Sequence, residues 1–277
     1  MKNFICLFIV LFSYSAFAGG PWLNKKKTGF FQLQSTFPGG SYNTLFLENG
    51  KESVLKNTVL DYTFQAYIEY GITNKFNVIA TLPYKLVSTQ QLNDSLALDD
   101  GSLSGLSNFK LGFKYQLIDK KIKLAVSLQS SLNTTSANLN KGLATGYQAN
   151  TFGVYAHIGT GFSAKLYSFL DFGANKMSNN YSDFIDFHYE IGYQIKPSFW
   201  LAFTLDLRES LKTGTANDLR LNQTGLYTNN QEYFAYGLKA SYELKNKIGF
   251  TAATFGAFSG NYVAKVATFS LGIYKKW

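Results

Sequence analysis

The residue types best suited to chemistry in this sequence are two histidines and the acids around one of them. His157 and His188 are the only histidines, and Asp186 and Glu190 flank His188 at a spacing of two residues. In a β-strand, residues two apart lie on the same face, so these three side chains would be neighbours. A histidine oriented by a carboxylate can act as a general base towards a serine or a water molecule, which is hydrolase chemistry. No serine is evident beside His188, so the pattern favours a polar network over a catalytic site.

Metal and cofactor chemistry has less support. His157 and His188 fall on different segments with no cysteine nearby, which matches the usual zinc ligand sets poorly. The sequence contains no glycine-rich phosphate loop and no dinucleotide-binding fingerprint. It therefore predicts no catalytic residue, no metal and no cofactor.

Charged side chains on alternating segments indicate a second kind of function, the selection of a solute. Those that the alternation assigns to one inner face are Lys85, Lys110, Lys114, Lys123, His157, Asp171, Asp186, His188, Glu190, Asp206, Arg208 and Lys239. Lysines gather on the third to fifth expected strands, and carboxylates with Arg208 on the seventh to ninth. Such segregation would set a transverse field across a lumen. The alternative is that these groups pair and plug the interior, because twelve strands enclose a lumen intermediate between a filled barrel and an open pore.

The segments that carry these residues alternate strictly between apolar and polar side chains. Residues 60–70 are typical, with Leu60, Tyr62 and Phe64 on one face and Asp61 and Thr63 on the other. Segments of roughly 9–14 residues are near or above the ~9–11 that a tilted membrane strand needs. The expected strands are 28–37, 58–70, 76–87, 105–117, 122–132, 147–159, 166–177, 184–195, 199–210, 232–244, 248–258 and 263–277.

The chemistry of the two faces decides between a soluble β-sandwich or lipocalin-like barrel and a membrane barrel. One face is bulky and aromatic in all the expected strands, whereas the other carries acids, lysines and histidines near mid-strand. A dry core would not tolerate those charges unpaired. Since a bilayer admits only helices or closed barrels, the pattern predicts an all-β, antiparallel, up-and-down transmembrane barrel of about 12 strands, apolar outside and polar inside.

The connections between the strands alternate in length and give the barrel an orientation. Long, polar connections fall at 38–57, 88–104, 133–146 and 211–231, and two short ones at 178–183 and 259–262 lie on the same side. The turns on the opposite side are short, rich in lysine and flanked by aromatic residues typical of an interfacial girdle: Tyr70, Tyr115, Tyr193, Tyr242 and Trp277. We expect the short turns in the periplasm and the long loops outside the cell.

The N-terminus and the composition fit an exported protein. Lys2, an apolar run over 4–12 and the small-residue sequence Ala16-Phe17-Ala18 have the order of a signal peptide, so we expect residues 1–18 to be removed and 19–277 to form one barrel domain. Cys6, the only cysteine, would leave with the signal. Of the 277 residues, 46% are hydrophobic, and this content excludes a disordered chain. The net charge is +9. Export without a basic helix argues against nucleic acid and for anionic lipid or an anionic solute.

Two segments resemble a family of outer-membrane proteins named for the MetA pathway of phenol degradation. They are Glu69 to Val78 followed by Leu82-Pro83-Tyr84, and Gly105 to Leu117. The family usually has Gly-Asp where this chain has Ser107-Asn108. The resemblance implies a barrel that moves small solutes, aromatic ones among them, and it supplies no catalytic residues.

Together these observations predict a barrel in the outer membrane of a Gram-negative cell that acts as a passive channel or uptake protein for small solutes. Its expected partners are outer-membrane lipid and a small-molecule solute, without nucleic acid, and it is expected to be a monomer. A barrel hydrolase and a non-conducting structural or adhesive barrel remain the alternatives.

Overall fold

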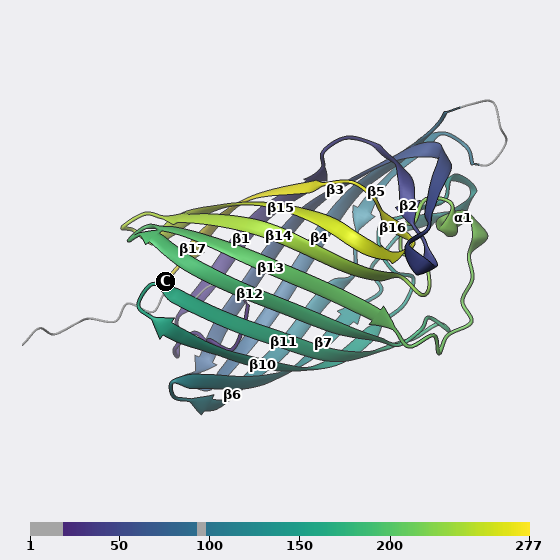
Figure 1. The fold of residues 1–277 in the computed structure, drawn as a ribbon. Helices are drawn as coiled ribbons and strands as arrows, with labels where there is room; N and C mark the ends of the chain where they lie inside the picture. Colours follow the sequence, from purple (N-terminus) through teal and green to yellow (C-terminus); the bar gives the residue numbers. More distant parts are fainter. Residues whose placement is uncertain (1–18, 93–97) are drawn as a thin grey trace, which may run out of the picture.

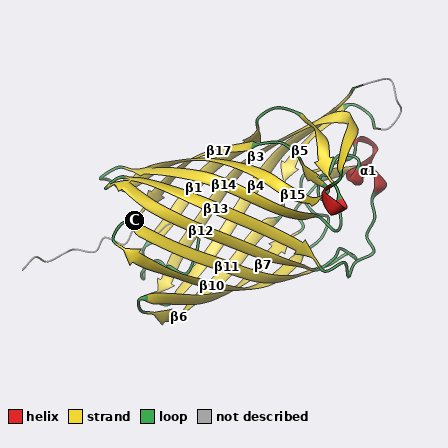
Figure 2. Ribbon diagram, viewed as in Figure 1, coloured by secondary structure: helices red, strands yellow, loops and turns green. Residues whose placement is uncertain are grey.

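The computed structural model describes residues 19–92 and 98–277, so the expected signal segment and Cys6 lie outside the described residues. The described chain forms a closed antiparallel barrel of twelve strands (Figures 1 and 2). These are β1 (Gly29–Pro38), β3 (Glu52–Thr73), β4 (Phe76–Gln91), β6 (Phe109–Asp119), β7 (Ile122–Leu132), β10 (Thr151–Ser163), β11 (Leu166–Met177), β12 (Phe184–Lys196), β13 (Phe199–Ser210), β14 (Glu232–Glu243), β15 (Ile248–Asn261) and β17 (Thr268–Lys276). The predicted fold class is confirmed.

The barrel closes between the first and last strands. β1 pairs with β17 from Phe30 opposite Lys276 to Pro38 opposite Thr268, and it pairs with β3 on its other side. The remaining strands follow in chain order around the wall, and β3 pairs with β4. Every barrel strand therefore has two hydrogen-bonded neighbours, which is what a lipid environment requires of a sheet.

The two faces of the wall have the chemistry that the alternation predicts. Leu128 and Leu238 point outwards and are 61% and 60% exposed, whereas Lys114 and Glu190 point inwards and are 1% exposed. A water-soluble barrel would reverse these values. The exposed apolar belt must therefore face an apolar solvent, as in a membrane barrel.

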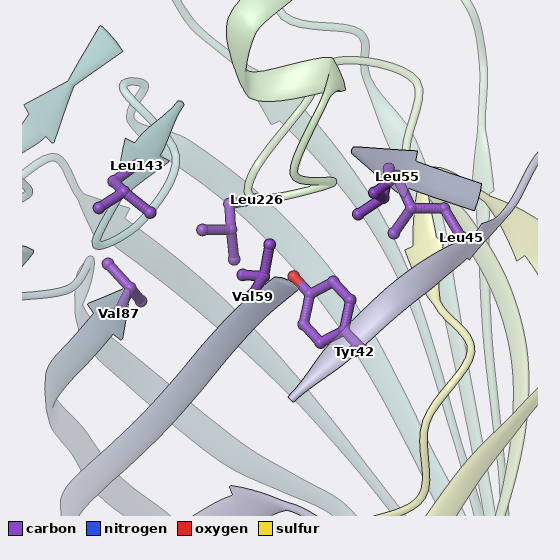
Figure 3. Packing of buried hydrophobic residues seen from close by; sticks show 7 residues of the cluster. All are labelled: Tyr42, Leu45, Leu55, Val59, Val87, Leu143 and Leu226. Carbon is purple, nitrogen blue, oxygen red and sulfur yellow. The ribbon is translucent and has the colours of Figure 1, made fainter. Parts of the chain in front are cut away.

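Extra structure covers the end of the barrel with the long loops. β2 (Tyr42–Phe46), β5 (Gly101–Leu106), β16 (Val263–Ala264), a short hairpin of β8 (Ala137–Asn138) and β9 (Leu143–Ala144), the one-turn helices η1 (Glu48–Gly50) and η2 (Leu139–Lys141), and helix α1 (Leu219–Asn222) gather there. An apolar cluster packs the loops against the ends of β3 and β4 that extend into the long-loop region (Figure 3). Its members are Tyr42, Leu45, Leu55, Val59, Val87, Leu143 and Leu226. The loops thus pack against the wall.

Some predicted boundaries are wrong for local reasons. The expected strand 105–117 is two strands, β5 and β6, because Ser107 and Asn108 interrupt the ladder between them. The Asn108 side chain donates to the carbonyl oxygens of Tyr147 at 2.8 Å and Ala149 at 3.2 Å. This interruption anchors the segment before β10, which begins at Thr151 rather than at residue 147.

The long connections also contain more strand than predicted. β3 begins at Glu52 and β4 continues to Gln91, inside the expected loops 38–57 and 88–104. The expected strand 263–277 begins only at Thr268, because Val263 and Ala264 pair with β2 instead. The wall near β3 and β4 therefore extends further than the rest.

The opposite end carries the short turns and the C-terminus (Figure 1). The Gly29 and Trp277 backbones exchange N–H to carbonyl hydrogen bonds of 3.2 and 3.1 Å there. Tyr115, Tyr193, Tyr242 and Trp277 are exposed on the outer surface near this rim. Within the described residues, no helix has the length and apolar character needed to cross a membrane.

Candidate solute site in the barrel lumen

Most of the charged side chains that alternation assigns to the inner face are ion-paired inside the barrel. The pairs, most of them between adjacent strands, are Lys85 with Asp61 (2.6 Å), Lys114 with Glu69 (3.6 Å), Lys123 with Asp119, His157 with Asp171 (2.8 Å), His188 with Asp206 (2.7 Å), Arg208 with Asp186 (3.0 Å) and Lys239 with Glu190. Asp61 and Glu69, both on β3, neutralise two of the lysines. The charges are therefore interleaved, and the expected separation into a lysine wall and a carboxylate wall is largely lost.

The chain before β1 lies inside the half of the lumen nearest the short turns. The Gly20 carbonyl oxygen accepts a hydrogen bond of 3.1 Å from the buried Lys114 ammonium. The Trp22 ring stands edge-on to Tyr167 and Phe169, with ring centroids 5.7 and 5.6 Å apart. This segment, residues 20–24, narrows the bore.

A cavity of about 320 Å³ lies further towards the long loops. Lys110, Arg208 and Lys85 supply cationic groups to its lining, and Asp186 supplies a carboxylate. The Arg208 guanidinium lies 4.0 Å from the centroid of the Phe184 ring. A polar cavity with aromatic walls can hold a small solute.

Tyr155 forms part of the cavity wall and depends on a glycine. A Cβ atom at Gly173 would lie 2.2 Å from the Tyr155 ring, so only glycine lets the ring lie against the strand there. The Tyr155 hydroxyl donates to the side-chain oxygen of Asn175 at 2.7 Å, and a carboxylate oxygen of Asp186 lies 3.3 Å from the same hydroxyl. The ring is therefore held at the edge of the cavity.

Two tyrosines from the loops complete this wall. Tyr147 donates to Gln231 at 2.6 Å, and Tyr227 lies beside it with ring centroids 5.2 Å apart. Burial raises the pKa of Tyr227 to about 12, with Lys85 opposing the shift. The phenol therefore stays neutral at physiological pH and adds no negative charge to the cavity.

The two histidines face the lumen in one row across β10, β11 and β12, on the short-turn side of the cavity. His157 Nδ1 is 2.8 Å from Asp171 and His157 Nε2 is 2.8 Å from the hydroxyl of Ser127. His188 Nδ1 is 2.7 Å from Asp206. Hydrogen bonds thus connect a serine, a histidine and an aspartate at His157. At His188 they connect only a histidine and an aspartate.

The sequence pattern around His188 gives no sign of Ser127, because this serine contacts the other histidine, His157. Ser127 is an inward-facing residue of β7, and its neighbour His157 is on β10. The turn between these strands is long and has its own hairpin, so their register cannot be worked out from the sequence. Alternation alone would have shown that both side chains face inwards.

A second cavity, of about 210 Å³, follows the wall made by β1, β14, β15 and β17. Gln32, Gln34 and Lys239 provide its polar lining, while Phe255 and Tyr274 provide aromatic surface. Together the two cavities adjoin strands all around the barrel.

Over the part of the chain that is described, no group of three or more histidine, cysteine, aspartate and glutamate side chains could hold a metal ion.

A closed twelve-stranded barrel with an apolar exterior and a charged interior is a transmembrane barrel of the bacterial outer membrane. Solved structures share this architecture. The COG4313 outer membrane channel from Pseudomonas putida F1 is similar with a TM-score of 0.68 at 15% identity, over 95% of this chain and 100% of that chain. The NanC porin has a TM-score of 0.53 at 10% identity, over 89% of this chain and 100% of the porin. The KdgM porin has a TM-score of 0.53 at 7% identity, over 90% of this chain and 99% of the porin. No family model and no curated protein matches the sequence.

Proposed function

We propose that this barrel is a passive outer-membrane channel for small solutes and that it acts as a monomer. The observation that carries the proposal is the polar cavity of about 320 Å³ inside a closed barrel, with a second of about 210 Å³ along the remaining wall. Residues 20–24 and the ion pairs keep the bore narrow. The channel therefore passes small molecules and excludes large ones.

The resemblance to the MetA-pathway family and the fold shared with a COG4313 channel and two porins point in the same direction. We propose membership of that family on residues 69–78, 82–84 and 105–117. The position of Ser107-Asn108, where the family usually has Gly-Asp, anchors the segment before β10 in this chain.

Solute flux into proteoliposomes tests the proposal. Liposomes that contain the folded protein should swell in glycerol and not in a trisaccharide of the same osmolarity. Trp22→Ala removes the ring that packs against Tyr167 and Phe169 and should increase the swelling rate. Phe162→Ala removes an exposed aromatic side chain at a turn and serves as the matched control. Equal swelling of protein-containing and empty liposomes, with both variants, would contradict a channel.

A second function, hydrolysis, is favoured by the arrangement of Ser127, His157 and Asp171. A hydroxyl, an imidazole and a carboxylate joined by two hydrogen bonds of 2.8 Å have the order of nucleophile, base and orienting group. Two features disfavour it. Ser127 is 2% exposed, and Gln129 donates to its hydroxyl at 3.1 Å, so a substrate would have to displace Gln129.

A fluorophosphonate probe distinguishes the two functions. A hydrolase would bind the probe covalently at Ser127, and labelling would be lost in Ser127→Ala and His157→Ala. His188→Ala is the matched control, because its aspartate pair does not include Ser127. We expect no labelling of the unmodified protein. Labelling that depends on Ser127 and His157 but not on His188 would support the hydrolase.

A further inference from the structure

We propose that the 320 Å³ cavity binds small aromatic carboxylates such as benzoate. The proposal rests on the proposed channel function, because it names the class of solute that the channel selects. It follows from one cation that has no counter-ion in the described part of the chain, from unused N–H donors on a neighbouring arginine and from the aromatic side chains around both.

The cation is Lys110. Its side chain lines the cavity and is exposed inside it, and among the described residues its ammonium makes neither a hydrogen bond nor an ion pair. The charged groups that act on it are Arg208 and Asp186. Since Asp186 is already paired with Arg208, Lys110 presents an uncompensated positive charge to any molecule that enters.

The charge of the whole lining agrees with a single negative charge on the solute. Lys85 is neutralised by Asp61 and Arg208 by Asp186, so Lys110 leaves an excess of one positive charge. Water in a narrow cavity solvates an ammonium less well than bulk water does. A monoanion would therefore be stabilised there, and a neutral solute would leave the ammonium uncompensated.

Arg208 can supply further donors for the same anion. Its Nε and Nη2 donate to Asp186 at 3.0 and 3.4 Å, and its Nη1 donates to the Tyr147 hydroxyl at 3.3 Å. A guanidinium has five N–H groups, so two remain after these three bonds. A carboxylate beside Lys110 could accept from one of them, which fixes its orientation as well as its charge.

The rest of the solute would lie against aromatic rings. Tyr147, Tyr155, Tyr227 and Phe184 all line the cavity. Planar rings prefer offset or edge-on contacts with other rings, which a saturated ring of the same size cannot make. The cavity volume lies at the small end of the range for ligand pockets, about 300–1,000 Å³, and thus fits a single ring.

Calorimetric titration of the folded protein in detergent with three matched probes distinguishes the contribution of the solute's negative charge to binding from that of its aromatic ring. Benzoate has both features, benzamide has the ring without the charge, and cyclohexanecarboxylate has the charge without the aromatic ring. We expect benzoate to bind, and each of the other two to bind about tenfold or more weakly. Equal affinity for benzoate and benzamide would overturn the role of charge, and equal affinity for benzoate and cyclohexanecarboxylate the role of the ring.

Lys110→Gln gives the second arm. Because none of the described residues pairs with the Lys110 ammonium, the variant should fold normally. It should bind benzoate about tenfold to hundredfold more weakly, the loss typical of one charged hydrogen bond. Lys265→Gln removes an exposed lysine that pairs with Glu52 outside the cavity and should bind benzoate as the unmodified protein does. Unchanged binding in Lys110→Gln would refute the site.

Binding and flux together distinguish the two proposals. Solute flux without benzoate binding would leave the channel intact and contradict this inference. Benzoate binding without flux of any solute would contradict the channel and leave a binding barrel.

Discussion

Removal of one partner from the buried Lys114 and Glu69 pair should destabilise the barrel strongly. Lys114 is 1% exposed and Glu69 is 2% exposed, so neither charge has water to replace its partner. Glu69 also accepts hydrogen bonds from Asn77 at 2.7 Å and Tyr67 at 2.9 Å. In Glu69→Gln, the Lys114 ammonium would lose its counter-ion and keep the hydrogen bond of 3.1 Å to the Gly20 carbonyl oxygen.

The geometry sets the size of the effect. Unit charges at the observed 3.6 Å attract by about 5 kcal/mol at an effective dielectric constant of about 20. Breaking a buried pair on one side typically costs about 3–5 kcal/mol, whereas replacing both partners by apolar groups is often nearly neutral. We therefore expect Glu69→Gln and Lys114→Met each to lower the free energy of unfolding by about 3–5 kcal/mol, and the double variant Glu69→Leu with Lys114→Met to recover much of it.

Equilibrium unfolding in guanidinium chloride, followed by the heat-modifiable band shift on a gel, measures these differences. Lys265→Met is the matched control, because Lys265 forms an exposed pair with Glu52 at 2.6 Å, with side chains 47% and 44% exposed. Such a pair is worth about 0–1 kcal/mol. Equal losses at Lys114 and Lys265 would show that the Lys114 ammonium reaches water and that the half of the lumen nearest the short turns is not filled.

Three further predictions test the faces, the orientation and the packing. Leu111→Arg, on the lipid side, should cost about 2–4 kcal/mol in the same unfolding assay, whereas Gly112→Ala, facing inwards, should be mild; equal costs would contradict the assigned faces. Asn222→Cys, in α1, should react with a membrane-impermeant thiol reagent on intact cells, and reaction only after permeabilisation would reverse the orientation. Gly173→Ala should lower stability by about 1–3 kcal/mol because the new methyl group overlaps the Tyr155 ring, and an unchanged unfolding midpoint would contradict that packing.

The sequence predicts the barrel because apolar and polar residues alternate along each strand. Tyr62 and Asp61 are adjacent in the chain and on opposite faces of the wall, and this is local information. The strand breaks at Ser107 and Asn108 are different, because they depend on hydrogen bonds to Thr134 and Tyr147 from other segments. Alternation carries no signal for such contacts.

The lumen is predictable only in part for the same reason. Alternation places Lys85 and Asp61 on the inner face, but only the register between β3 and β4 brings them to 2.6 Å. Ser127 and His157 meet across strands joined by a long connection. The segment around Trp22 has no periodic pattern that would place it inside the barrel. Its position depends on contacts with Tyr167, Phe169 and Lys114, which are far away in the sequence.

Single-channel current across a planar bilayer measures whether the lumen conducts. The unmodified protein should give discrete current steps. Lys110→Gln should move the reversal potential towards cation selectivity, more strongly in dilute salt, where the screening length grows from ~10 Å at 0.1 M to ~30 Å at 0.01 M. Folded, heat-modifiable protein that inserts into the bilayer without any current steps would contradict a conducting lumen.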